Sequence, residues 1–178
     1  MNAGTVTVFL GDSLTFGNDW GKAFPQADCR NLGLNGDTLT GVWCRLDEVA
    51  ALNPAVIFLQ IGINNFLSGT KNSEIVSGHK RIWGELGDKA PQAKLYVLSL
   101  LPYLDSQMPG YRPNADIAAV NVVLAEEART SGLDFVDFFA KMADGHMRLR
   151  PEYTSDGLHL SPAGYRIWEE AVRGLVPA

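Results

Sequence analysis

The stretch that decides the fold is Val8-Phe9-Leu10-Gly11-Asp12-Ser13-Leu14-Thr15, in which an apolar run stops abruptly at Gly-Asp-Ser. The run from Val6 to Leu10 is rich in β-branched and aromatic residues and predicts a short buried strand. Gly11 has no Cβ, so the chain can turn sharply there and leave the hydroxyl of Ser13 uncovered. Open α/β sheets carry their functional groups just beyond the carboxyl ends of such strands. Taken alone, these eight residues favour a simpler interpretation, in which Asp12 or Ser13 acts only as the cap of the next helix.

Predicted strands and helices alternate along the rest of the chain. Four further strands are predicted at residues 29–34, 55–61, 94–100 and 134–138. Helices are predicted at 39–52, about 74–88, about 115–130 and from 162 onward, where Ser161-Pro162 is typical of a helix start. This order predicts an α/β protein, a three-layer α/β/α sandwich on a flavodoxin-like, doubly wound, mostly parallel five-stranded sheet. With no repeat or linker, residues 1–178 are expected to form a single domain.

Composition limits the classes of function. The chain has 178 residues, enough to bury a core without disulfides or a metal. Its net charge of -5 argues against a general nucleic-acid or anionic-membrane binder, since both need a positive face. No apolar stretch is long enough to span a bilayer, and the first strand begins too close to Met1 for a signal peptide, so a cytoplasmic protein is expected. The two cysteines, Cys29 and Cys44, are predicted to be reduced thiols, with a disulfide between them as the alternative.

Polar residues follow the ends of several predicted strands. Ser13, Gly36 and Asn64 come just after the first, second and third strands, and Asp156-Gly157-Leu158-His159 lies in the long loop after the fifth. Because the carboxyl ends of parallel strands meet at one edge of a sheet, we expect these four segments to converge there.

These residue types suit acyl transfer. A serine hydroxyl is a weak nucleophile at neutral pH, but His159 can accept its proton while Asp156 holds the other ring nitrogen. The backbone N–H groups of Ser13 and Gly36 and the side-chain amide of Asn64 can donate to the oxyanion of a tetrahedral intermediate. The predicted catalytic residues are therefore Ser13, Asp156 and His159, and the predicted oxyanion hole consists of Ser13, Gly36 and Asn64.

Four blocks of the sequence carry a resemblance to a known family. They are Gly11-Asp12-Ser13-Leu14-Thr15-Phe16-Gly17, Asn31-Leu32-Gly33-Leu34-Asn35-Gly36-Asp37-Thr38, Gly62-Ile63-Asn64-Asn65 and Asp156-Gly157-Leu158-His159. In order and spacing the chain resembles a GDSL-type esterase/lipase of the SGNH-hydrolase superfamily. The resemblance implies the same roles for Ser13, Gly36, Asn64, Asp156 and His159. The third block of that family often reads Gly-x-Asn-Asp, so Asn65 is a departure that is expected to alter the hydrogen bonds behind the site.

The sequence thus predicts a serine esterase that cleaves small-molecule carboxylic esters through a covalent acyl-enzyme. No insertion is long enough for a large lid, so an open or shallow site and short acyl or acetyl groups are expected. Phe66, Leu67, Tyr103 and Leu104 lie in the flanking loops and are predicted to contact the substrate. Lysophospholipase and thioesterase activity remain alternatives within the superfamily. The alternative of another class is a non-catalytic, flavodoxin-like module that binds a small ligand.

No cofactor and no metal site are predicted. His79, on a predicted helix, and His146, in a loop, lack the paired spacing of metal ligands and are interpreted as solvated. Trp20 follows the predicted nucleophile closely and is considered for the pocket wall. No nucleic-acid partner and no transmembrane segment are expected, and the oligomeric state is left open, with a homodimer as one option.

Overall fold

The computed structural model describes residues 5–177, and these residues form a five-stranded sheet. Its strands are β1 (Val6–Gly11), β2 (Asp28–Gly33), β3 (Val56–Gln60), β4 (Lys94–Leu98) and β5 (Asp134–Val136). Every neighbouring pair is parallel, and the order across the sheet is β2-β1-β3-β4-β5. This is the flavodoxin-like doubly wound order, so the predicted fold class is confirmed.

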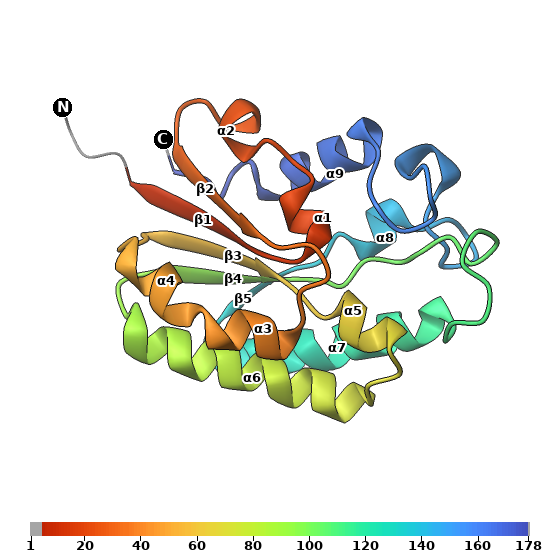
Figure 1. Cartoon of the computed structure of the whole chain (residues 1–178), viewed down its shortest axis with the longest axis horizontal. Coiled ribbons are helices and arrows are strands. Elements are labelled where there is room, and N and C mark those ends of the chain that lie inside the picture. Colours follow the sequence, from red (N-terminus) through yellow and green to blue (C-terminus); the bar gives the residue numbers. More distant parts are fainter. Residues whose placement is uncertain (1–4, 178) are drawn as a thin grey trace.

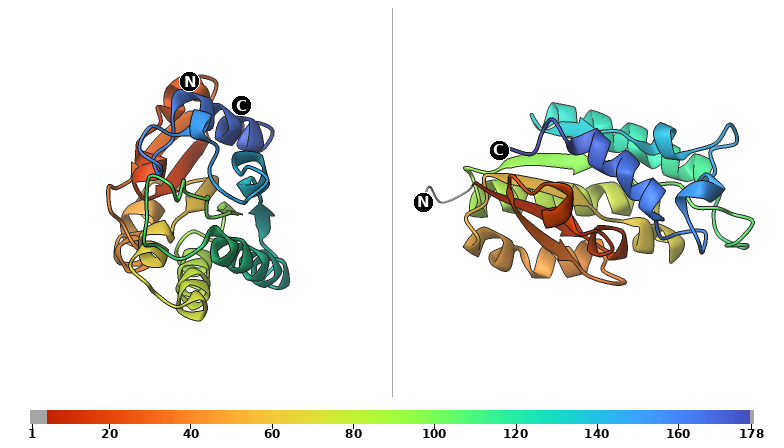
Figure 2. Two further views of the ribbon diagram at one scale, coloured as in Figure 1. Left: turned by 90° about the vertical axis from the view of Figure 1, so that its right-hand side faces the viewer. Right: turned by 90° about the horizontal axis from the view of Figure 1, so that it is seen from above.

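Helices cover both faces of the sheet (Figure 1). One face carries α3 (Leu39–Cys44), α4 (Leu46–Ala51), α6 (Asn72–Lys89) and α7 (Asn114–Thr130). The other face carries α1 (Ser13–Phe16), α2 (Trp20–Ala23), α8 (Phe139–Met142) and α9 (Pro162–Val172). The short α5 (Ile63–Leu67) follows β3 directly, and the 3₁₀ helix η1 (Pro151–Tyr153) packs against α9. Figure 2 shows the same layers from the edge where the strands end and from above α9.

The strand β1 lies in the interior of the sheet, because it pairs with β2 on one side and β3 on the other. Its residues Val8, Phe9 and Leu10 are fully buried. The ring of Trp20 stacks on Phe9 at 4.0 Å between centroids, and its indole N–H donates to the Thr15 carbonyl at 2.9 Å. Trp20 is 1% exposed, so it packs in the core and does not form a pocket wall.

The helix predicted at 39–52 is two helices. Arg45 separates α3 from α4 with φ -117° and ψ 18°, outside the helical range. The short helices α1 and α2 were not predicted, since each has four residues and too little periodicity to detect. Side-chain caps mark their starts: Asp12 accepts from Leu14 N–H and Asp19 accepts from Lys22 N–H.

The prediction that His79 is solvated is wrong. Its side chain is completely buried on α6, with Nε2 3.0 Å from the Ile61 carbonyl oxygen. Burial lowers the pKa of His79 to about 4, so the ring is neutral and Nε2–H can donate to that carbonyl. The signal was present in the sequence, because His79 falls on the same helical face as the buried Ile75, Ile82 and Leu86. His146 is exposed, as predicted.

Three features bear on the composition-based predictions. Cys29 and Cys44 are free thiols. In the part of the chain that the structure describes, no helix has the length and apolarity required to cross a membrane. Between residues 5 and 177, no three His, Cys, Asp or Glu side chains are grouped so that they could hold a metal ion.

Candidate active site

Ser13 is the first residue of α1 and lies directly beyond the end of β1. A Cβ on Gly11 would lie 2.1 Å from the Gln60 carbonyl oxygen and 2.3 Å from Thr15 Oγ1, so only glycine permits this close approach of β1, β3 and α1. Asp12 caps α1, with Oδ1 3.0 Å from Leu14 N. Asp12 is therefore a helix cap, as one alternative proposed, and Ser13 itself is left half-buried with its hydroxyl available.

The serine, histidine and aspartate of the first and last blocks are in direct contact. Ser13 Oγ lies 3.0 Å from His159 Nε2, although the two residues are 146 positions apart in the chain. His159 Nδ1 lies 2.6 Å from Asp156 Oδ2. A carboxylate only accepts, so Nδ1 carries the proton and Nε2 presents its lone pair to the Ser13 hydroxyl.

The loop that carries His159 is held by its own hydrogen bonds. Asp156 Oδ1 accepts from the backbone N–H groups of Leu158 at 2.9 Å and His159 at 2.8 Å. Thr154 Oγ1 donates to the His159 carbonyl at 2.7 Å and accepts from Gly157 N–H at 2.9 Å. Burial opposes ionisation of Asp156, but hydrogen bonds from the His159 ring and the backbone outweigh it and lower the pKa of Asp156 to about 2. The carboxylate is therefore charged beside the imidazole throughout the neutral range.

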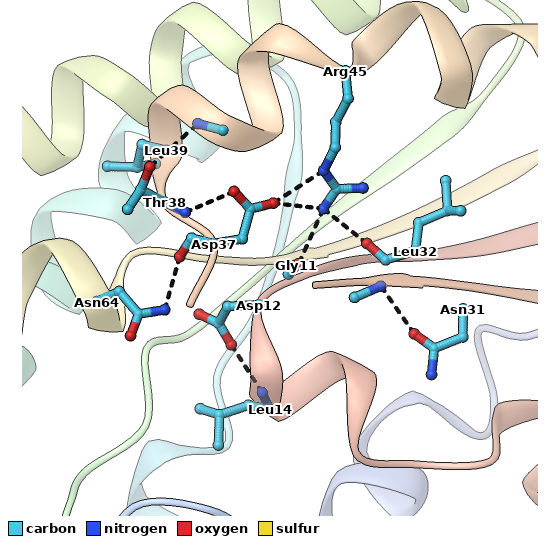
Figure 3. Close-up of polar contacts among 12 residues, drawn as sticks. Gly11, Asp12, Leu14, Asn31, Leu32, Asp37, Thr38, Leu39, Arg45 and Asn64 are labelled. Atoms are coloured by element: carbon cyan, nitrogen blue, oxygen red, sulfur yellow. Dashed lines mark hydrogen bonds and ion pairs between the residues drawn. The ribbon is translucent and has the colours of Figure 1, made fainter. Parts of the chain in front are cut away.

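The predicted oxyanion donors come from the ends of three adjacent strands. Ser13 N–H is at the start of α1, where helices have no internal acceptor. Gly36, exposed in the loop after β2, has φ +74°, a conformation that favours glycine. Asn64, on α5 after β3, donates one amide hydrogen from Nδ2 to the Asp37 carbonyl at 2.7 Å, which leaves its second amide hydrogen for another acceptor (Figure 3).

Asn65, the departure in the third block, takes part in this arrangement. Its Oδ1 accepts from Leu39 N–H at 2.9 Å, at the start of α3. The hydrogen bond joins α5 to α3 behind the predicted oxyanion hole. An aspartate would offer the same acceptor, so the departure preserves the contact.

Burial does not support three of the predicted substrate contacts. Phe66 is 0% exposed, Tyr103 is 1% exposed and Leu104 is 6% exposed, so their side chains contribute to the core; Leu67 is half-buried. The Arg112 guanidinium lies 4.4 Å from the Phe66 ring centroid, and the Tyr103 hydroxyl donates to the Arg112 carbonyl. These side chains point into the core because removing their apolar surface from water is favourable when the two flanking loops pack against the protein.

Sequence reasoning missed the residues that connect these loops, chiefly Arg45 and Asp37. Their side chains form an ion pair of 2.8 Å and are only 10% and 8% exposed. The sequence contains a pattern that could have identified Arg45, because this charged residue falls beside the apolar stripe formed by the buried residues Leu39, Val42 and Leu46. An ionised residue on such a stripe needs a buried partner.

Asp12 provides a prediction about stability. Burial raises the pKa of the Asp12 carboxyl to about 7; Leu14 N–H and His159 oppose the shift, and the Asp37 carboxylate adds to it. Between about pH 4 and pH 7 the folded protein holds a proton that the unfolded chain has lost, so stability falls as the pH rises through that window. The wild type should therefore lose stability between pH 4 and pH 8, whereas Asp12→Asn, which has no carboxyl to ionise, should not. Over this range the free energy of unfolding of Asp12→Asn should rise by roughly 2 to 4 kcal/mol relative to that of wild type.

Urea unfolding at several pH values measures this difference. Asp19→Asn is the control, because the Asp19 side chain also caps a short helix, α2, but is exposed. A pH-independent difference between Asp12→Asn and wild type would mean that Asp12 is ionised throughout.

The site is open to solvent, with 48% of the His159 side chain and 52% of the Asp156 side chain exposed. A parallel α/β sheet with a hydroxyl, an imidazole and a carboxylate in hydrogen-bond contact at its carboxyl edge has the architecture of a serine-hydrolase-like class. The chain belongs to the GDSL-like Lipase/Acylhydrolase family, whose sequence model matches residues 9–167.

Similar proteins have related descriptions. The platelet-activating factor acetylhydrolase IB subunit alpha1 of Bos taurus is 31% identical over 165 residues, which cover 89% of this chain and 69% of that protein; the Homo sapiens protein gives the same values. A solved structure of a putative acylhydrolase from Bacteroides fragilis has a TM-score of 0.87 and 23% identity, covering 98% of this chain and 88% of that one. A structure described as a putative platelet activating factor from Streptococcus pneumonia also has a TM-score of 0.87, with 26% identity and coverage of 98% and 85%. The family and the acetylhydrolase relatives indicate a carboxylic ester hydrolase, which overturns the alternative of a non-catalytic binding module.

Proposed function

We propose that this protein is a serine esterase that hydrolyses acetyl and other short-chain esters through a covalent intermediate on Ser13. The observation that carries the proposal is the continuous contact of Ser13 Oγ, the His159 ring and Asp156 Oδ2, at 3.0 and 2.6 Å. A base this close to a serine hydroxyl can remove its proton as the oxygen attacks.

In the first half of the reaction, Ser13 Oγ attacks the carbonyl carbon of the ester and its proton passes to His159 Nε2. The charged Asp156 stabilises the imidazolium that forms. The carbonyl oxygen becomes an oxyanion, which accepts hydrogen bonds from the N–H groups of Ser13 and Gly36 and from Asn64 Nδ2. When the C–O bond of the ester breaks, His159 returns the proton to the leaving alcohol.

In the second half, water attacks the acyl group on Ser13. His159 takes a proton from the water and delivers it to Ser13 Oγ as the acid is released. The exposure of the His159 side chain lets water reach this position without movement of a lid.

Two observations favour short acyl groups. The curated relatives are named as acetylhydrolases, and acetyl is the shortest common acyl group. The core packing of Phe66, Tyr103 and Leu104 removes the apolar side chains that a long chain would contact. Hydrolysis rates for p-nitrophenyl esters from acetyl to palmitoyl, beside lysophospholipids and acyl thioesters, distinguish the short-chain esterase from the lysophospholipase and thioesterase alternatives.

The test of the mechanism is trapping of the acyl-enzyme. Rapid mixing with excess p-nitrophenyl acetate should give a burst of p-nitrophenolate, provided deacylation is the slower step, and a fluorophosphonate should label one serine. Peptide mass spectrometry should find that label on Ser13 in wild type and on no residue of Ser13→Ala. Labelling of a different serine, or hydrolysis that survives complete labelling of Ser13, would contradict the proposal.

Replacing Asn64 with alanine should lower kcat by roughly 100- to 1,000-fold with little change in KM, because the lost hydrogen bond is made mainly in the transition state. Steady-state kinetics with p-nitrophenyl acetate measure the split between kcat and KM. Gln92→Ala, which removes an exposed side-chain amide just before β4, is the control. A loss confined to KM would argue for a ground-state contact with the substrate instead.

A further inference from the structure

Arg45 is a charged residue whose mostly buried side chain makes four hydrogen bonds near the site, and none of the four sequence blocks contains it. Its Nε and Nη2 donate to Asp37 Oδ2 at 3.0 and 2.8 Å. Nη2 also donates to the carbonyls of Leu32 at 2.8 Å and Gly11 at 3.1 Å (Figure 3). Both members of the ion pair are at least nine-tenths buried, so solvent screens the interaction weakly.

These acceptors lie where the predicted oxyanion donors are attached. Gly11 ends β1 two residues before Ser13, and Leu32 is the penultimate residue of β2. Asp37 directly follows Gly36, and its carbonyl accepts the Asn64 amide at 2.7 Å. A single guanidinium thus links the loops that carry all three donors.

The interruption between α3 and α4 occurs at Arg45 itself. Its non-helical backbone accompanies a side chain directed back to the ends of β1 and β2 (Figure 3). The opposite side of Asp37 is also confined, because a Cβ on Gly41 would lie 1.8 Å from Asp37 Oδ1. The Asp37 carboxylate therefore lies between Arg45 and Gly41, and its Oδ1 also accepts from Thr38 N–H at 2.8 Å.

We propose that Arg45 is a positioning residue that, through Asp37, holds Gly36 N–H and the Asn64 amide in the geometry that receives the oxyanion. This inference rests on the proposed esterase function. Arginine is required because a planar guanidinium can serve a carboxylate and two carbonyls at once, whereas a lysine ammonium is a point charge on a flexible stem. Oxyanion donors act only when they point at the developing charge, so small displacements are costly.

The first test is Arg45→Lys, which keeps the positive charge beside Asp37 and removes the planar fork. We expect kcat for p-nitrophenyl acetate to fall roughly 10- to 100-fold with KM within about twofold of wild type. Arg129→Lys is the control, because Arg129 forms an exposed ion pair with Glu126 near the opposite ends of the strands. A wild-type kcat in Arg45→Lys would overturn the inference.

A double-mutant cycle separates positioning from general destabilisation. In the Asn64→Ala background one of the donors that Arg45 positions is absent, so the additional loss from Arg45→Lys should be at least several-fold smaller than in wild type. Equal fold-losses in the two backgrounds would show that Arg45 does not act through the Asn64 amide, and would refute the proposal.

Gly41→Ala perturbs the same carboxylate without changing any charge, and carries the test if Arg45→Lys does not fold by near-UV circular dichroism. Gly41→Ala should lower kcat and leave KM largely unchanged. The fold-loss in kcat that it causes should be smaller in the Asn64→Ala background than in wild type. A Gly41→Ala protein with the wild-type kcat would count against the proposal. Ser13→Ala separates failure of the proposed esterase function from failure of the proposed role of Arg45. If Ser13→Ala remains active, the esterase mechanism is wrong. If Ser13→Ala is inactive and Arg45→Lys is fully active, only the role of Arg45 is refuted.

Discussion

Replacing Ser13 with alanine should lower kcat for p-nitrophenyl acetate by roughly 10⁴- to 10⁶-fold, because it removes the atom that forms the covalent intermediate. The residual rate would come from direct attack of water on the ester, with the remaining donors stabilising the oxyanion. KM and the near-UV circular dichroism spectrum should change little, since the half-buried Ser13 hydroxyl contributes one hydrogen bond, to the exposed ring of His159.

Ser77→Ala is the matched control for this experiment. The Ser77 hydroxyl is exposed on α6 and donates to the Glu74 carbonyl. Ser77→Ala therefore removes one serine hydroxyl that makes no contact with Ser13, Asp156 or His159. If Ser13→Ala and Ser77→Ala both keep the wild-type rate, another group supplies the nucleophile and the proposed function is wrong.

His159→Ala should have an effect of similar size, with kcat lowered by roughly 10⁴-fold or more. Without the imidazole, no base among residues 5–177 hydrogen-bonds to the Ser13 hydroxyl, and the leaving alcohol loses its proposed proton donor. About half of the His159 side chain is exposed, so the variant should fold normally and external imidazole should restore part of the activity.

His146→Ala, which removes an exposed loop histidine, controls for the loss of an imidazole in general. An unfolded circular dichroism spectrum for His159→Ala would assign this residue a structural role. A variant that folds and retains most of its kcat would exclude His159 as the base.

The strands were predictable because their signal is local. β1 and β3 are mostly apolar runs with β-branched and aromatic residues, interrupted only by Thr7 and Gln60, and the structure buries them on both faces. The start of α9 was predictable for the same reason, since Ser161 caps it and Pro162 occupies its first turn.

The break at Arg45 and the burial of His79 were not predicted. Arg45 bonds to carbonyls on β1 and β2, which are close to it only after the chain has folded. His79 is paired with the Ile61 carbonyl, 18 positions away in the chain. Propensity and periodicity describe one element at a time, so contacts between distant elements can override them.

The sequence by itself determined the fold class, the family and the residues brought to one edge of the sheet, because strand patterns and the right-handed connections between parallel strands follow from local chemistry. Only the tertiary structure decided the distances: the 3.0 Å between Ser13 and His159, the burial of Phe66 and Tyr103, and the Asp37–Arg45 pair. The physical reason is that hydrogen bonds and packing depend on separations of a few tenths of an ångström, and these are settled when residues far apart in the chain pack against each other.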